Sequence, residues 1–301
     1  MTLSVLVTGA SGFVGSHLAR ALVEEGHDVR AMTRRPQRYD GAGTPVRGDV
    51  SDPESLRAAL DGVDVAYYLV HSLDSKNFEE KDAEAARSFS AAAAVAGVRQ
   101  IVYLGGLGDD GSDLSPHLRS RRQVESLLGS ADVPVTALRA AIVVGHGGIS
   151  WEITRQLVKN LPAMIAPRWV STRTQPIALE DVVRYLVGVL DNPEAVGRVF
   201  EIGGPEVLRY EDMLRRASKV QNGRDVPIVV VPLLTPRLSS YWLSLVTDVD
   251  AATGRNLVES MATEVVVHDE TIRSVVPFEP MGYNDMVRAA LSERLQEGEG
   301  G

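Results

Sequence analysis

Short apolar runs rich in β-branched residues alternate with longer segments of helical period over the first half of the chain. The runs predict strands at residues 4–8, 28–33, 45–50, 63–70, 99–105 and 133–144. Apolar residues at helical spacing predict helices at residues 13–25, 53–60, 76–96 and 116–128. Strands and helices that alternate in this way form a parallel sheet with helices on both faces. We therefore expect an α/β fold, a Rossmann-type doubly wound parallel sheet.

The pattern loosens from residue 146. Helices are predicted at residues 151–160, 179–191 and 210–220, and joints rich in proline and glycine separate them. We predict a Rossmann region at residues 1–145 and a smaller C-terminal region of mixed α/β structure at residues 146–301. The second region is expected to be integrated with the first and to supply the substrate side of the site.

Charge and composition argue against several classes of partner. The chain carries 31 basic and 40 acidic residues, a net charge of -9, whereas nucleic-acid phosphates require a basic face. The longest apolar region, "PIVVVPLLTPRLSSYWLSLV", is interrupted by Pro232, Pro236 and Arg237, so no membrane-spanning segment is expected. The absence of cysteine fits a reducing, cytoplasmic location. The six histidines lack the spacing of a metal site, so no metal is predicted.

Three glycines, Gly9, Gly12 and Gly15, lie between the first predicted strand and the first predicted helix. In this position one glycine makes a tight turn, another lets the backbone approach a pyrophosphate, and the third lets the helix pack close to the strand. An ordinary glycine turn is the alternative, but the strand before the motif and the helix after it favour dinucleotide binding. The predicted cofactor loop consists of Gly9, Ser11, Gly12, Phe13, Val14 and Gly15.

The end of the second predicted strand indicates which dinucleotide binds. Thr33 is followed by Arg34 and Arg35, where an NAD-binding protein would carry an acidic residue for the ribose 2'-hydroxyl. Two guanidinium groups suit a 2'-phosphate, so the sequence predicts NADP(H), with NAD(H) as the weaker alternative. The competing interpretation is a solvated basic loop on an acidic protein.

The end of the third predicted strand supplies candidates for the adenine. The Asp49 carboxylate can accept a hydrogen bond from the adenine amino group while Val50 packs on the ring. Asp52 has an alternative role as a helix cap, with Pro53 in the first turn. The nicotinamide would then face the loop after Val70 and the loops after the fifth and sixth predicted strands.

With these motifs, the chain resembles the extended and atypical branches of the short-chain dehydrogenase/reductase superfamily. The segments "TGASGFVG" and "GDVSD" are similar to the family's cofactor loop and adenine contact, and "TQPIALEDVV" and "GRVFEIGGPEVLRYEDML" to substrate-side segments of sugar-epimerase-like members. The segments "YYLVHSL", "YLGGLGDD", "LSPHLRSRRQVE" and "LTPRLSSYW" resemble an atypical group of NAD(P)H-binding proteins. The resemblance implies the fold and a nicotinamide cofactor.

The chain departs from this family at the catalytic residues. Members that transfer a hydride carry a serine or threonine after the fifth strand and a Y-x-x-x-K motif on the next helix. Here the strand ends in Gly105 and Gly106, and the helix carries His117 and Arg121 at the two motif positions. Glu125 lies four residues after the lysine-equivalent position, as in the family pattern, which supports this alignment of the helix.

The substituted positions still offer chemistry. His117 and His71 are candidate proton donors because imidazole titrates near neutrality, although a packing role is the alternative for each. Arg121 is a candidate for binding the nicotinamide ribose or a phosphate, since its high pKa makes it a poor proton carrier. Trp151 and Trp169 follow the sixth predicted strand and are candidates for substrate walls, core packing or a dimer contact.

Three functions follow from these residues and the resemblance. The favoured one is an NADP(H)-dependent oxidoreductase of the atypical type that reduces a carbonyl or conjugated small molecule. The second is a non-catalytic NAD(P)H-binding sensor or assembly protein, and the third, a nucleotide-sugar epimerase, ranks last because it normally needs the missing tyrosine. We expect a small-molecule substrate and a monomer or homodimer.

Overall fold

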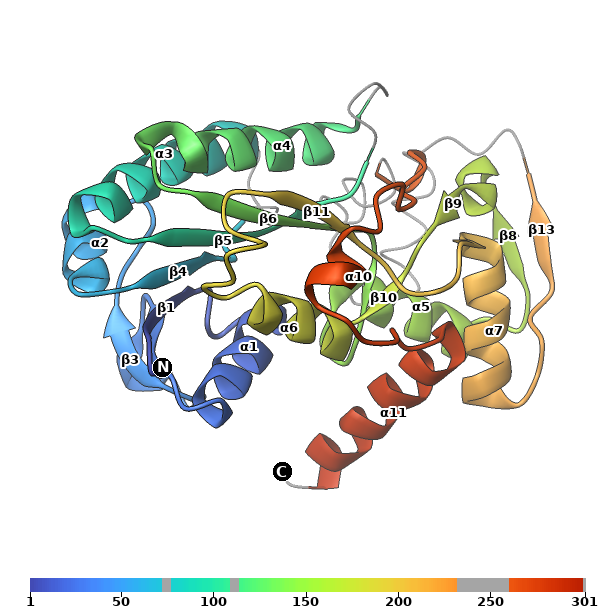
Figure 1. The fold of residues 1–301 in the computed structure, drawn as a ribbon. Coiled ribbons are helices and arrows are strands. Elements are labelled where there is room, and N and C mark those ends of the chain that lie inside the picture. Colours follow the sequence, from blue (N-terminus) through green and yellow to red (C-terminus); the bar gives the residue numbers. More distant parts are fainter. Residues whose placement is uncertain (72–76, 109–113, 232–259, 300–301) are drawn as a thin grey trace.

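A seven-stranded parallel sheet forms the centre of the protein. The computed structural model describes residues 1–71, 77–108, 114–231 and 260–299 (Figure 1). The strands are β1 Ser4–Thr8, β2 Asp28–Thr33, β3 Thr44–Arg47, β4 Val65–Tyr68, β5 Gln100–Gly106, β6 Val135–Ala140 and β11 Val199–Ile202. Their order is β11-β6-β5-β4-β1-β2-β3, with every neighbouring pair parallel. The predicted Rossmann-type sheet is confirmed.

Helices cover both faces of this sheet. One face carries α1 Phe13–Glu24 and α6 Leu179–Gly188, and the other carries α2 Pro53–Leu60, α3 Phe78–Ala96 and α4 Pro116–Leu128 (Figure 1). The alternation of side chains along β1 serves both layers. Val5 and Val7 join the apolar cluster that contains Leu18 of α1, whereas Leu6 joins the cluster that contains Leu56 of α2. A strand buried on both faces reads as a continuous apolar run, which is what the sequence shows.

Several boundaries differ from those predicted. Strand β3 ends at Arg47, so Asp49 and Val50 lie in the turn after it. The apolar run at residues 133–144 divides into β6 and the short strand β7 Val143–Val144, because β7 pairs with β10 Ile177–Ala178 instead of continuing in the main sheet. Helix α3 begins at Phe78, and the predicted start at residue 76 lies outside the described residues.

The seventh strand comes from beyond residue 145. Strand β11 pairs in parallel with β6 through Val199–Ile202, so the predicted regions share one sheet, and their division at residue 145 stays a prediction. The rest of the C-terminal part contains α5 Ile149–Asn160, β8 Met164–Ala166, β9 Arg173–Thr174, β12 Leu208–Arg209, α7 Tyr210–Asn222, β13 Ile228–Val230, α10 Ile272–Val275 and α11 Tyr283–Glu299.

A separate apolar cluster supports this part of the molecule. Trp151 of α5, Met213 of α7 and Met286 of α11 are all buried in it, where α7 packs against both α5 and α11 (Figure 1). The described residues also contain short one-turn 3-10 helices at Pro36–Arg38, Gly129–Ala131 and Arg168–Ser171. Among the residues that the structure describes, no helix has both the length and the apolar character needed to cross a bilayer.

Candidate cofactor and active site

The glycine loop joins β1 to α1 in the conformation that the motif predicts. Gly9 has φ +66°, a left-handed conformation that favours glycine, and its carbonyl accepts a hydrogen bond of 2.8 Å from the Gly12 amide. Gly12 is the N-cap of α1, no side chain caps this helix, and its first turn contains no acidic residue. The positive end of the α1 dipole is thus presented to an anion at the loop.

Gly12 and Gly15 have different structural roles. A Cβ atom at Gly15 would lie 2.1 Å from the Gly9 carbonyl oxygen, so glycine is required for α1 to pack against the loop. A Cβ atom at Gly12 would meet, among the described residues, only the Gly9 carbonyl oxygen within 4 Å, at 3.1 Å. Gly12 is otherwise exposed, which fits a position that a pyrophosphate approaches.

The residues predicted for the adenosine side lie near one another after β2 and β3. Arg34 and Arg35 are exposed, and the Arg35 amide donates to the Thr33 hydroxyl at 3.2 Å. The pKa of Asp49 is lowered, mainly by hydrogen bonds from the side chain and backbone of Ser51 and to a lesser degree by the charge of Arg34. Both bonds reach the same carboxylate oxygen, at 2.7 and 2.9 Å. Asp49 is thus an ionised acceptor.

The alternative role proposed for Asp52 is confirmed. Its carboxylate accepts hydrogen bonds from the amides of Glu54 and Ser55, and Pro53 lies in the first turn of α2. Val50 packs against the cluster beneath α2 and α3, and Val70 contacts the same cluster. Only Asp49 therefore remains as a predicted polar contact for the adenine.

The candidate catalytic residues meet in one cavity of about 230 Å³. His71 follows β4, whereas His117 and Arg121 lie on α4, and all three line the cavity. Phe13, at the start of α1, lines it as well, which links the cavity to the glycine loop. Most of the remaining wall is apolar and includes Leu104, Leu107, Leu118, Ile142, Met261 and Val265.

Arg121 is held by the strand beneath it. Its guanidinium donates to the Leu104 carbonyl oxygen, and its Cζ atom lies 5.1 Å from the centre of the Tyr103 ring. The Tyr103 hydroxyl in turn donates to the Arg121 carbonyl at 3.1 Å. Gly106 makes room for this helix, since a Cβ atom there would lie 2.7 Å from Leu118. Arg121 is thus a fixed positive charge on the cavity wall.

This charge affects both histidines. Burial and, to a lesser degree, the charges of Arg121 and His71 lower the pKa of His117 to about 3. Desolvation by neighbouring protein atoms and, to a lesser degree, the charge of Arg121 lower the pKa of His71 to about 4. Because this residue is more exposed than His117, solvent weakens both effects there. Both rings are neutral at pH 7, and the prediction that His117 titrates near neutrality was wrong. A neutral imidazole is a weak acid but remains a hydrogen-bond donor.

Two serines connected to His117 were not found from the sequence. The Ser115 hydroxyl caps α4 by accepting from the Leu118 amide at 3.3 Å, and it lies 3.1 Å from the Ser260 hydroxyl. Ser260 in turn lies 3.4 Å from His117 Nδ1. A serine before proline is a recognisable helix start, but no motif marks Ser260, which is 143 residues from His117 in sequence.

The candidate wall residues Trp151 and Trp169 do not line the cavity. Trp151 is 1% exposed and belongs to the C-terminal core, and Trp169 packs edge-to-face on Tyr210 with ring centres 5.8 Å apart. Both tryptophans therefore pack in or against the core, and their interpretation as walls of the substrate site was wrong. Tyr210 does line the cavity. The segment "LTPRLSSYW", which contributed to the family resemblance, lies outside the described residues.

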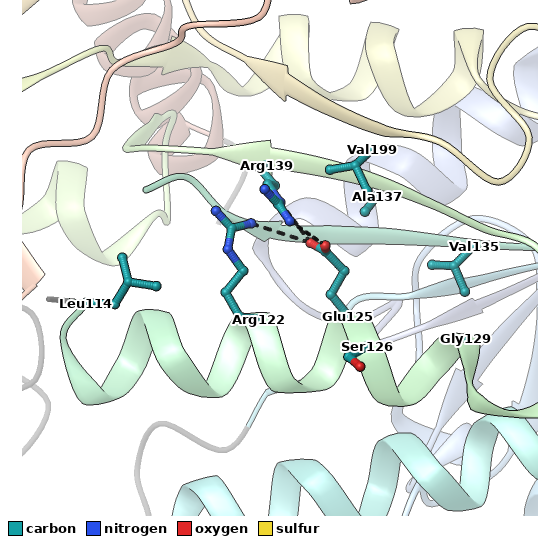
Figure 2. A pocket seen from close by; sticks show the side chains of 9 residues that line it. All are labelled: Leu114, Arg122, Glu125, Ser126, Gly129, Val135, Ala137, Arg139 and Val199. Carbon is teal, nitrogen blue, oxygen red and sulfur yellow. Dashed lines mark hydrogen bonds and ion pairs between the residues drawn. The ribbon is translucent and has the colours of Figure 1, made fainter. Parts of the chain in front are cut away.

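A larger hollow of about 530 Å³ lies elsewhere, between α4 and strands β6 and β11. Among the described residues it shares no lining residue with the cavity of His117. Figure 2 shows Glu125 and Arg122 on α4 pointing toward Arg139 on β6. Arg139 makes a bidentate pair with Glu125, with N–O distances of 2.6 and 3.0 Å, and Arg122 lies 3.6 Å from the same carboxylate. Glu125 therefore ties α4 to the sheet.

We expect Glu125→Gln to destabilise the fold by about 2 to 3 kcal/mol, because Arg139 and Arg122 would both lose their ion pair with the same largely buried carboxylate. The side chains of Glu125 and Arg139 are only 14% exposed. Chemical denaturation at pH 7 measures this. The matched control is Asp285→Asn, which removes an ion pair to Arg288 whose side chains are 64% and 61% exposed, and it should change the unfolding free energy by less than about 0.5 kcal/mol. Equal effects of the two variants would contradict a structural role for Glu125.

Comparison with known proteins agrees with this fold and loop. The profile of a family described as NAD(P)H-binding matches residues 9–193, and the chain belongs to that family. The (4-alkanoyl-5-oxo-2,5-dihydrofuran-3-yl)methyl phosphate reductase of Streptomyces griseus is 31% identical over 72% of this chain and 73% of its own. The photosystem II assembly factor Ycf39 of Cyanophora paradoxa is 23% identical over 77% of this chain and 72% of its own.

Solved structures show the same fold. A short-chain dehydrogenase/reductase superfamily protein from Agrobacterium tumefaciens with bound NAD has a TM-score of 0.70 at 20% identity and covers 98% of each chain. The triphenylmethane reductase of a Citrobacter species, complexed with NADP(H), has a TM-score of 0.76 at 16% identity over 95% of this chain and 99% of its own. The expected NAD(P)H-binding family is confirmed, and the fold is the one that the short-chain dehydrogenase/reductase superfamily protein has.

Proposed function

We propose that this protein is an NADP(H)-dependent oxidoreductase that reduces a carbonyl or conjugated small molecule. The observation that carries the proposal is the meeting of His71, His117 and Arg121 in one largely apolar cavity that reaches Phe13 of the glycine loop. A concave apolar site with a few convergent polar groups is typical of small-molecule binding. The Streptomyces relative, named as a reductase, supports the same class of reaction.

The cofactor would bind across the carboxyl edge of the sheet. The loop Gly9–Gly15 would hold the pyrophosphate at the start of α1, and Arg34 and Arg35 the 2'-phosphate. Asp49 would accept from the adenine, Val50 would pack on it, and Val70, His71 and Arg121 would border the nicotinamide. When bound, NADPH supplies a hydride, and the cavity walls orient the acceptor and exclude water.

A non-catalytic role in sensing or assembly is the second candidate. It is favoured by the absence of the Y-x-x-x-K pair, by the neutral state of both histidines, and by the similarity to a photosystem II assembly factor. Nucleotide-sugar epimerisation ranks third, because the tyrosine on which it normally depends is replaced by His117. A cytoplasmic location and a monomeric or homodimeric state also remain proposals.

Cofactor consumption distinguishes the first two candidates. The purified protein is mixed with NADPH and a panel of saturated ketones, enones and quinones, and the loss of NADPH absorbance is followed. We expect saturable consumption with at least one acceptor and none when the Gly12→Val variant is used as the control. Tight NADPH binding in calorimetry without consumption across the panel would favour the sensor or assembly role.

A further inference from the structure

We propose that His117 acts as a neutral hydrogen-bond donor through Nε2–H, that Ser260 positions it by bonding Nδ1, and that the substrate is a conjugated acceptor such as an enone or quinone. This inference rests on the proposed reductase function and names the substrate class and a positioning residue of that same site. A histidine in this role keeps its proton, whereas a histidine acid would transfer its proton to the substrate. The two roles therefore suit different substrates.

A directed chain of hydrogen bonds leads to His117. The Leu118 amide, which can only donate, points at the Ser115 hydroxyl oxygen at 3.3 Å. Ser115 is 8% exposed, so its own proton needs an acceptor inside the protein, and the Ser260 oxygen lies 3.1 Å away. Ser260 can then donate to His117 Nδ1 at 3.4 Å. In this direction the chain ends at a nitrogen that accepts.

The charges around the ring support a neutral form. Arg121 lies one helical turn along α4 and lines the same cavity, as does His71 after β4. A second positive charge on His117 would be repelled by the Arg121 guanidinium in a partly buried site. A neutral imidazole carries a single N–H, so a ring that accepts at Nδ1 carries its proton on Nε2. A proton that Ser260 donates to Nδ1 would thus make Nε2 the ring atom that donates.

The neutral state of His117 favours one kind of substrate. Hydride addition to the β-carbon of an enone moves the C=C electron pair into a new C=C bond and the carbonyl pair onto oxygen, which gives an enolate and an oxidised cofactor. The enolate accepts a hydrogen bond from His117 Nε2–H and is stabilised by the Arg121 charge. Water then delivers the proton to the α-carbon. A saturated ketone would instead form an alkoxide, a much stronger base that requires proton donation during hydride transfer.

Variants of His117 separate donation of a hydrogen bond from donation of a proton. The probes are 2-cyclohexenone, menadione and the saturated control cyclohexanone, each with NADPH. We expect His117→Ala to lower kcat for the conjugated acceptors by about 100-fold, because a positioned donor contributes factors of this size. His117→Gln should recover most of that loss, since its amide N–H reaches a similar position but cannot act as an acid. Equal losses in both variants would overturn the donor role, and equal reduction of cyclohexanone would overturn the substrate class.

The pH profile gives a second readout. The pKa of His117 is about 3 and that of His71 about 4, and both lie below the working range, so neither ring changes charge there. We expect kcat of the unmodified protein to be level from about pH 5 to 8. A histidine acid with a pKa in this range would instead make kcat fall as the pH rises through that pKa.

Ser260 is tested by a measurement that needs no substrate. Nitrogen-15 NMR of the full chain saturated with NADP⁺ reports which ring nitrogen of His117 carries the proton. We expect the Nε2–H form in the unmodified protein and in Ser260→Thr, and a mixture of the two forms in Ser260→Ala, with kcat lowered by about tenfold in the alanine variant alone. An Nδ1–H form in the unmodified protein, or no change in the alanine variant, would refute the positioning role. If no acceptor is reduced, the proposed function fails while the NMR result still decides the role of Ser260.

Discussion

Gly12→Val is expected to weaken the binding of NADPH and NADH alike by at least about 100-fold, or about 2.8 kcal/mol. The reason is steric, because Gly12 is exposed at the start of α1, where its glycine backbone lets a pyrophosphate approach. Its φ of -88° and ψ of 173° are accessible to valine. The new Cβ atom would lie 3.1 Å from the Gly9 carbonyl oxygen, which needs only a small shift of the loop, so the variant should fold. Isothermal titration calorimetry with both dinucleotides measures the loss.

Two other glycines serve as controls for this variant. Gly129→Ala changes a helix end where the new Cβ atom would lie 3.8 Å from Val135, an ordinary contact, and it should leave cofactor binding unchanged. Gly15→Ala should instead damage the loop itself, since the Cβ atom would lie 2.1 Å from the Gly9 carbonyl oxygen. A folded Gly12→Val protein that still binds NADPH would show that the cofactor site has been assigned to the wrong loop.

Replacing both Arg34 and Arg35 by serine should lower the affinity for NADPH by about 100-fold and leave that for NADH nearly unchanged. Charge-assisted hydrogen bonds to a phosphate contribute roughly 1.5 to 3 kcal/mol each, and the low end applies here because both side chains are exposed. Calorimetry at two salt concentrations measures the effect, which should shrink as salt rises.

Arg38→Ser is the matched control for the arginine pair. Arg38 is exposed in the next turn of the same segment, and its loss changes the net charge by one unit without removing a predicted phosphate contact. It should preserve the preference for NADPH. Equal affinities of the unmodified protein for NADPH and NADH would refute the assignment of NADP(H) and return the two arginines to a solvated basic loop.

Features that depend on neighbours in sequence were predictable. The alternation of apolar runs and helical segments identified six strands of the main sheet and the helices around it. The glycine spacing located the loop between β1 and α1 because turn, close approach and helix packing each restrict one nearby backbone position. Caps were visible for the same reason, since Asp52 bonds amides only two and three residues away.

Features that depend on distant contacts were not predictable. Strand β11 joins the sheet by pairing with β6, which lies more than 60 positions earlier in the sequence. A strand of four residues is too short to give a clear periodic pattern. The resemblance to sugar-epimerase-like proteins singled out the segment that contains β11, but it did not indicate which strand β11 pairs with. The 133–144 run divides into two strands because β10 pairs with only its last two residues.

For the site, the sequence by itself determined the loop that the cofactor would bind and the residue types His71, His117 and Arg121 at the carboxyl edge of the sheet. Tertiary structure alone decided that these three side chains share a cavity, that Ser260 reaches His117, and that both histidines are neutral. The physical reason is that a glycine turn is set by local backbone geometry, whereas a pKa is set by burial and by charges that the fold brings near.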